Sequence, residues 1–189
     1  MPDYPDIWFL RHGETLWNRE GRIQGRRDSD LTARGRAQAA QQATIVAPIV
    51  PKVLAAGGAI HVSPLGRARA TAEIAMPGLP YEINPDLAEV GTGAWEGCLK
   101  ADLPQGGFDL DIYAAAPDGE GFDILQARVR RFLDSLDGPA IVVSHGLLGQ
   151  VMRGLVCGLD RAGMAALPNR QGCVFLLRGG VETLLEPQA

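Results

Sequence analysis

Short apolar runs that alternate with helical patterns constrain this chain more than any other feature of its sequence. The runs are IWFL at 7–10, AIHV at 59–62, AIVV at 140–143 and CVFLL at 173–177. Four or five apolar residues bounded by polar ones are typical of a buried strand. Strands alternating with helices predict an α/β fold, a three-layer sandwich with a central, mostly parallel sheet, helices on both faces and right-handed crossovers.

The expected helices carry recognisable start and stop residues. Thr32 can cap a helix that ends at Pro48, and Ser63 with Pro64 has the order expected of an N-cap and a first helical position. Apolar residues recur at helical spacing between 122 and 136, which predicts a helix there. A further helix is expected over 146–158, shortly after the third apolar run. These helices lie between the expected strands, as a parallel sheet requires.

Length and composition limit the classes to which the chain can belong. With 189 residues, 46% of them hydrophobic, we expect one domain over 1–189. A formal net charge of -4 argues against a nucleic-acid binder, and no apolar stretch reaches the length of a membrane span, so we expect a cytoplasmic protein. Cys98, Cys157 and Cys173 are odd in number and widely spaced, which argues against a disulfide framework or a zinc site.

Three apolar runs stop at clusters of polar residues. The first is followed by Arg11, His12, Gly13 and Glu14, the second by Ser63 with Arg67 one turn on, and the third by Ser144, His145 and Gly146. Because the carboxyl ends of parallel strands meet at one edge of a sheet, these clusters are expected to converge there. Two histidines and two arginines at helix N-termini would form a pocket for a dianion such as phosphate.

Other features favour ordinary structural interpretations. His61 lies within an expected strand, and GTGAWEG at 91–97 lacks the glycine spacing of a dinucleotide loop. VVSHG at 142–146 lacks the first glycine of a serine-hydrolase elbow. The DLD tripeptide at 109–111 is best interpreted as part of a solvated loop, so no metal site is expected.

Four motifs in order give a family resemblance over nearly the whole chain: LRHGETLWN at 10–18, SPLGRARATA at 63–72, LAEVGTGAWEG at 87–97 and VVSHG at 142–146. The sequence resembles the phosphatase branch of the histidine phosphatase superfamily, also called phosphoglycerate-mutase-like. The resemblance implies a phosphomonoester hydrolase for a small phosphorylated metabolite, working through a phosphohistidine without metal or cofactor. The residues that it implies are His12 as nucleophile, Glu89 as proton donor, and Arg11, Asn18, Arg67 and His145 as phosphate contacts.

The chemistry of these residue types agrees with that expectation. An imidazole can accept a phosphoryl group and release it to water, while arginines stabilise the charge on the transferring oxygens. An alkoxide leaves poorly, so an acid must protonate it. Glu89 is the preferred donor, and Glu96 in the WEG tripeptide is its rival.

Two alternatives to simple hydrolysis remain at this point. A phosphoglycerate-mutase-type phosphotransferase must hold a second phosphate, whereas the segment 98–119 contains one lysine and four aspartates, a balance expected to repel one. A catalytically inactive protein that only binds phosphorylated ligands would be expected to have lost part of the motif set, which is intact here. The sequence therefore favours hydrolysis, and it leaves the oligomeric state open.

Overall fold

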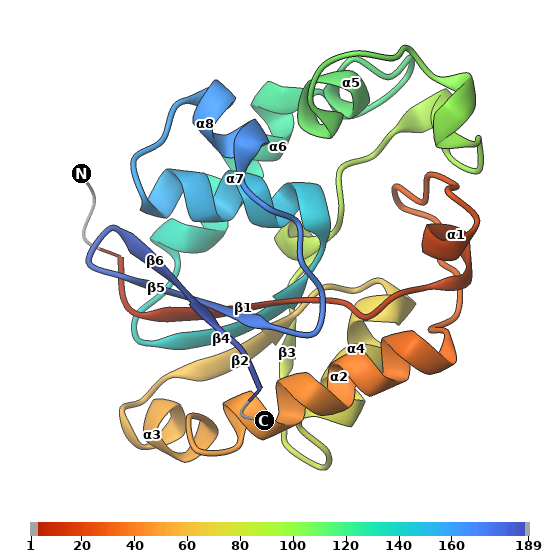
Figure 1. The fold of residues 1–189 in the computed structure, drawn as a ribbon. Helices are drawn as coiled ribbons and strands as arrows, with labels where there is room; N and C mark the ends of the chain where they lie inside the picture. The colour runs from red at the N-terminus through yellow and green to blue at the C-terminus, as the bar shows by residue number, and fades with distance from the viewer. Residues whose placement is uncertain (1–3, 188–189) are drawn as a thin grey trace.

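A six-stranded sheet forms the centre of the computed structural model, which describes residues 4–187 (Figure 1). Its strand order is β3-β2-β4-β1-β5-β6. Strands β1 to β4 run parallel to one another, whereas β5 is antiparallel to β1 and to β6. The bounds are β1 (Ile7–Arg11), β2 (Ala59–Val62), β3 (Glu82–Ile83), β4 (Ala140–Ser144), β5 (Val174–Arg178) and β6 (Val181–Leu185).

Helices cover both faces of the sheet, as predicted (Figure 1). One face carries α2 (Ala33–Val46), α3 (Val50–Ala55) and α4 (Gly66–Ala75), and the other carries α6 (Phe122–Asp134), α7 (Gly146–Val156) and α8 (Arg161–Ala166). Side chains of β1 alternate between the two cores: Ile7 and Phe9 pack with the α6–α8 layer, Trp8 and Leu10 with the other. This alternation follows from the pleat of a strand that is buried on both faces.

Shorter elements surround the carboxyl edge of the sheet. They are α1 (Leu16–Arg19), α5 (Asp109–Ala114) and three single turns of 3₁₀ helix at Pro85–Leu87, Gly93–Trp95 and Lys100–Asp102. No helix in the range 4–187 combines the length and the apolar character that a bilayer crossing requires.

The predicted helix starts are right in one case and wrong in another. Thr32 caps α2, since its hydroxyl accepts a hydrogen bond from the Gly35 N–H at 3.0 Å. Ser63 does not cap α4, which begins at Gly66; the Asp28 carboxylate instead accepts the N–H groups of Gly66 and Arg67 at 2.7 and 3.2 Å. A carboxylate 38 positions earlier in the chain lies outside any local capping pattern, which explains the error.

The DLD tripeptide at 109–111 is also not a loop. It begins α5, where Asp109 and Asp111 occupy the first turn. Acidic side chains are favourable at a helix N-terminus, because they lie near its partial positive charge. The tripeptide is therefore part of a short helix, although the polar sequence around it gave no helical period.

The register of the parallel strands aligns the three polar clusters. Arg11 pairs with Ser144, and Val62 pairs with Val143, so β1, β2 and β4 end level with one another. The His12 N–H donates to Ser144 O at 3.0 Å, and the Ser63 N–H donates to Val143 O at 3.0 Å. The residues that follow these strands therefore share one edge of the sheet.

Candidate active site

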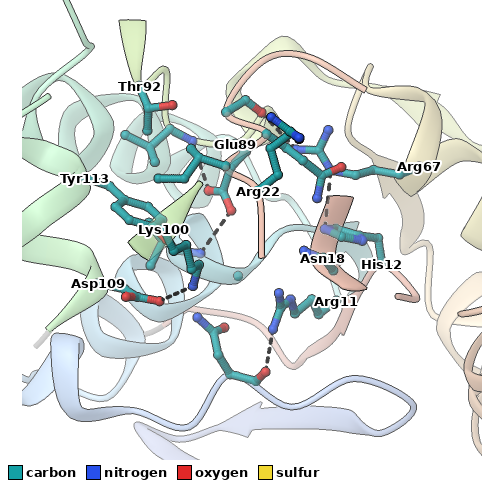
Figure 2. A pocket seen from close by; sticks show the side chains of 17 residues that line it. Arg11, His12, Asn18, Arg22, Arg67, Glu89, Thr92, Lys100, Asp109 and Tyr113 are labelled. Atoms are coloured by element: carbon teal, nitrogen blue, oxygen red, sulfur yellow. Dashed lines mark hydrogen bonds and ion pairs between the residues drawn. The ribbon is translucent and has the colours of Figure 1, made fainter. Parts of the chain in front are cut away.

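A cavity opens at this edge, between the ends of β1, β4 and α4 and the segment that contains α5 (Figure 2). Of the six residues expected to form the site, all but His145 line it, and His145 is fully buried with its ring centroid 5.2 Å from that of His12. The structure therefore brings the six together from four separate parts of the chain. The cavity is lined by Arg11, His12, Asn18, Arg22, Ile23, Gln24, Gly25, Arg67, Glu89, Val90, Thr92, Lys100, Asp109, Tyr113, Gly146, Leu147 and Asn169.

His12 follows β1 and is only 3% exposed. Its Nδ1 lies 2.8 Å from the Gly13 carbonyl oxygen, and its Nε2 is 3.3 Å from the Arg67 Nε. A carbonyl only accepts and a guanidinium only donates, so the ring carries its proton on Nδ1 and a lone pair on Nε2. Burial, reinforced by the charges of Arg67 and Arg11, holds the pKa of His12 well below its usual value of 6.5. The ring is thus neutral at pH 7, with Nε2 available as a nucleophile.

Arg67 is held by four hydrogen bonds at the start of α4. Besides the contact from Nε to His12, Nη1 donates to the Arg27 carbonyl at 2.7 Å and to the Asp28 carboxylate at 2.9 Å. Nη2 donates to the Gly25 carbonyl at 2.9 Å. A guanidinium has five N–H groups, so one of those on Nη2 has no bond in this set. The pKa of Arg67 is lowered because it is buried, and Glu89 is the largest opposing influence.

Arg11 lies on the other side of His12 in the cavity wall (Figure 2). Its Nη1 donates to the Asn169 carbonyl oxygen at 2.5 Å, and its buried Nε has no partner within residues 4–187. Asn18 lies close by; its side-chain oxygen accepts the Thr15 N–H at 3.2 Å, which leaves the amide NH₂ free for a ligand. The arginines supply charge, and Asn18 supplies a neutral donor.

His145 directly follows β4 and caps no backbone group of α7 with its side chain. Its Nε2 is 2.7 Å from the Ser63 hydroxyl, whereas its buried Nδ1 has no protein partner in the described part of the chain. Burial, with the charge of Arg67 next in importance, holds the pKa of His145 well below 6.5. The second histidine is therefore also neutral at pH 7.

Glu89 lies across the cavity from His12 and is anchored by the N-terminus of α7 (Figure 2). Its Oε1 accepts the N–H groups of Val90 and Leu148 at 2.9 and 3.0 Å, and its Oε2 accepts that of Leu147 at 3.1 Å. All three partners are donors, which suits a carboxylate. No other residue proposed for proton transfer occupies the cavity wall.

Glu96, the rival candidate, faces a different part of the structure. Its carboxylate accepts the N–H groups of Arg26 and Thr92 at 2.8 and 3.3 Å, and it lies 3.8 Å from the Arg27 guanidinium. It does not line the cavity. Its contacts tie the loop at 24–27 to the segment that follows Glu89.

The acidic segment 98–119 was expected to repel a second phosphate, but most of its acidic side chains lie away from the cavity. Of its four aspartates only Asp109 lines the cavity, and that carboxylate is 2.8 Å from the Lys100 Nζ. Asp111 is paired with Arg161 at 2.7 Å. Lys100 and Arg22 both line the outer wall of the cavity (Figure 2). The prediction that four aspartates would repel a second phosphate here is thus wrong, because three of them do not line the cavity and the fourth is paired with Lys100.

Several residues of the site were not identified from the sequence. Asn169 supports Arg11, and Gln171 donates from its side chain to the His12 carbonyl at 2.9 Å. Both belong to the polar loop PNRQG at 168–172, just before the fourth apolar run. The polar character of this loop was the available signal. It was missed because β5 is antiparallel to β1, so the start of β5, and not its end, lies at the edge of the sheet that carries the site. Within residues 4–187 no group of three or more histidine, cysteine or acidic side chains is arranged to bind a metal ion.

Comparisons with known proteins agree on one family. Residues 7–183 match the family described as the histidine phosphatase superfamily (branch 1). The Escherichia coli K12 protein named adenosylcobalamin/alpha-ribazole phosphatase is 32% identical over 184 residues, covering 88% of this chain and 86% of that protein. The Erwinia tasmaniensis protein named "Probable phosphoglycerate mutase GpmB" is 33% identical over 169 residues, covering 81% of this chain and 75% of its own. The crystal structure of TTHB049 from Thermus thermophilus superposes with a TM-score of 0.72 at 32% identity, covering 97% of this chain and 99% of that one.

Proposed function

This chain belongs to the histidine phosphatase superfamily, and from its pocket we propose that it is a metal-independent phosphomonoester hydrolase acting through a phosphohistidine on a small phosphorylated metabolite. One observation carries the proposal: the unprotonated Nε2 of a neutral His12 faces a cavity between two guanidinium groups. That combination supplies a nucleophile and the charge that a phosphoryl group requires.

The first step transfers the phosphoryl group to His12. The Nε–H of Arg67 donates to the Nε2 lone pair of His12. A phosphoryl oxygen that accepts this N–H, together with the remaining one on Nη2, frees the lone pair for attack on phosphorus. The N–P bond then forms as the bond to the leaving oxygen breaks, and Arg11 and Arg67 stabilise the equatorial oxygens. Asn18 and His145 contribute neutral donors.

Glu89 handles the proton in both halves of the reaction. Because it is held as a carboxylate by three N–H groups, its proton comes with the substrate; a phosphomonoester has a second pKa of about 6 and carries that proton in part near neutrality. Glu89 passes the proton to the departing alkoxide. It then accepts a proton from the water that attacks the phosphohistidine, and the N–P bond breaks, which restores His12. The proton passes from Glu89 to the inorganic phosphate, which carries it away and leaves Glu89 as a carboxylate again.

The test is detection of the intermediate. Wild-type protein mixed with 4-nitrophenyl phosphate and quenched in base should contain acid-labile, base-stable phosphate, and His12→Ala should contain none and turn over no substrate. His61→Gln is the matched control, since His61 is the third of only three histidines and its ring packs edge-on against Phe132, outside the cavity. Undiminished turnover by His12→Ala would end the phosphohistidine proposal.

A mutase-type transfer is a second candidate, because Arg22 and Lys100 in the outer wall could hold a second anionic group. Product analysis with 3-phosphoglycerate and 2,3-bisphosphoglycerate, beside a panel of monophosphates, separates the two. A hydrolase releases free phosphate from the monophosphates and interconverts phosphoglycerates slowly. Rapid interconversion with little free phosphate would assign the mutase activity instead.

A further inference from the structure

Ser63 makes a buried polar contact that the phosphoryl-transfer steps do not use. Ser63 and His145 are both fully buried, and the hydroxyl oxygen lies 2.7 Å from the imidazole Nε2. The Leu65 N–H also donates to that hydroxyl oxygen at 3.3 Å. The hydroxyl hydrogen has no acceptor other than His145 Nε2 among the hydrogen bonds of the described residues.

Counting hydrogens distinguishes two arrangements of this pair. If Nε2 is protonated and donates to Ser63, the hydroxyl hydrogen and the Nδ1 lone pair of His145 are both buried without partners. If the hydroxyl donates to Nε2, the ring proton is on Nδ1, and that N–H alone has no protein partner. Unpaired buried polar groups are costly, so the second arrangement is favoured.

A bound phosphoryl group completes the second arrangement. The two imidazole rings are 5.2 Å apart between centroids, so a phosphoryl group on His12 lies next to His145. Oxygens of a phosphoryl dianion accept hydrogen bonds and do not donate them, which suits an N–H and not a lone pair. The group of the Ser63–His145 pair that has no protein partner among the described residues is thus a donor placed beside the proposed ligand.

We propose that Ser63 is a positioning residue whose hydroxyl donates to Nε2 of His145, fixing a neutral ring with its proton on Nδ1 as the donor to the transferring phosphoryl group. The proposal rests on the phosphatase function proposed above. It also explains why His145 can donate without becoming an imidazolium. A proton on Nε2 would remove the lone pair that accepts the Ser63 hydroxyl hydrogen, so the neutral ring is the form that fits this contact. Neutral histidine in water favours the proton on Nε2, so Ser63 reverses the intrinsic preference of the ring.

The first measurement determines the tautomer of His145 in the wild-type protein. With ¹⁵N-labelled histidine, the chain gives only three imidazole patterns, which the His61→Gln and His12→Ala variants assign by elimination. A protonated and an unprotonated ring nitrogen have well-separated ¹⁵N shifts. We expect His145 to be protonated on Nδ1 and unprotonated on Nε2, without added phosphate. A protonated Nε2 would overturn the proposal, whatever the enzyme activity proves to be.

A pair of matched variants then tests the role of the hydroxyl. Ser144 is also fully buried and neighbours His145, but its hydroxyl donates to the Leu87 carbonyl at 2.7 Å. Ser63→Ala should shift the His145 ring toward the Nε2-protonated form and weaken the binding of inorganic phosphate about 10-fold, the cost of one misdirected buried hydrogen bond. Ser144→Ala should change neither quantity by more than about twofold, although it removes the same number of atoms.

Binding is measured by titrating inorganic phosphate and following the His145 signals, so the readout needs no turnover. Circular dichroism and thermal unfolding check that each variant is folded. If Ser63→Ala does not fold, Ser63→Cys, which fills the site with a slightly larger group and a weaker donor, should give a partial shift of the tautomer. An unchanged tautomer and unchanged phosphate affinity in a folded Ser63 variant would remove Ser63 from this role.

Discussion

Replacing Glu89 with glutamine separates proton donation from the structural contacts of the same side chain. Glutamine retains one carbonyl oxygen, which can still accept the N–H groups of Val90 and Leu148. Its NH₂ then faces the Leu147 N–H, donor against donor, where the carboxylate accepted at 3.1 Å. The expected cost is about 1–3 kcal/mol of local stability, and it affects every substrate alike.

The loss of the proton donor depends on the leaving group. General acid catalysis contributes about 10²–10⁴ in rate when an alkoxide must be protonated, and little when a nitrophenolate leaves. Glu89→Gln should therefore reduce kcat/KM for an alkyl phosphate such as glycerol phosphate by about 10² or more beyond its effect on 4-nitrophenyl phosphate. The structural cost cancels in the ratio of the two losses in kcat/KM, so the ratio measures only the contribution of proton donation.

Glu96→Gln is the matched control for this experiment. Its carboxylate also accepts two backbone N–H groups, at 2.8 and 3.3 Å, but does not line the cavity. Glu96→Gln should lower kcat/KM for both substrates by the same factor, because its effect comes only through weaker contacts to the loop at 24–27. Equal losses for both substrates in Glu89→Gln, or a selective alkyl loss in Glu96→Gln, would refute the assignment.

Three further predictions concern charge and protonation. Arg67→Ala should lower kcat/KM for 4-nitrophenyl phosphate by about 10²–10³, because it removes a preorganised charge; a loss under about tenfold would argue against contact with the transferring group. Vanadate should inhibit competitively and EDTA should have no effect, whereas an EDTA-inactivated enzyme rescued by a divalent ion would disprove metal independence. The folded pKa values of His12 and His145 lie well below 6.5, so the unfolded chain binds protons that the folded chain does not as the pH falls below 6.5. Stability should therefore decrease on acidification by up to about 1.4 kcal/mol per pH unit for each ring; urea unfolding at pH 7 and 5 should show a smaller decrease in a His12→Gln/His145→Gln variant, and an equal decrease would contradict the linkage.

Most of the sheet could be predicted from the sequence, because buried strands have a strong local pattern of apolar residues. Strand β2 coincides with the predicted 59–62, β1 and β4 are each one residue longer than their predicted runs, and β5 is shifted by one residue from its run. Two strands were not predicted, for different reasons. Strand β6 at Val181–Leu185 is an edge strand with alternating exposure, and β3 at Glu82–Ile83 is only two residues long, so neither produces an apolar run.

The parts of the site that were predictable are those that follow parallel strands. His12 and His145 are fixed by the ends of β1 and β4, and their meeting follows from the register. The supporting contacts were not predictable, because each joins residues far apart in the chain. Asn169 and Arg11 are 158 positions apart, and Glu89 and Leu147 are 58 apart. No spacing within one motif reveals such a pair.

The helix N-termini at this edge act differently from the sequence-based expectation. Side chains at these N-termini were expected to form a phosphate pocket, and the first N–H groups of both helices bind carboxylates: Asp28 accepts those of α4, and Glu89 accepts those of α7. A helix N-terminus carries about half a unit of positive charge, which offsets part of the negative charge of each carboxylate. If the proposed phosphate dianion binds in this cavity, the offset would reduce the repulsion between it and Glu89. In the proposed reaction, binding of the phosphoryl group would therefore depend on the side chains of Arg11 and Arg67, and the N-terminus of α7 would hold Glu89 beside them.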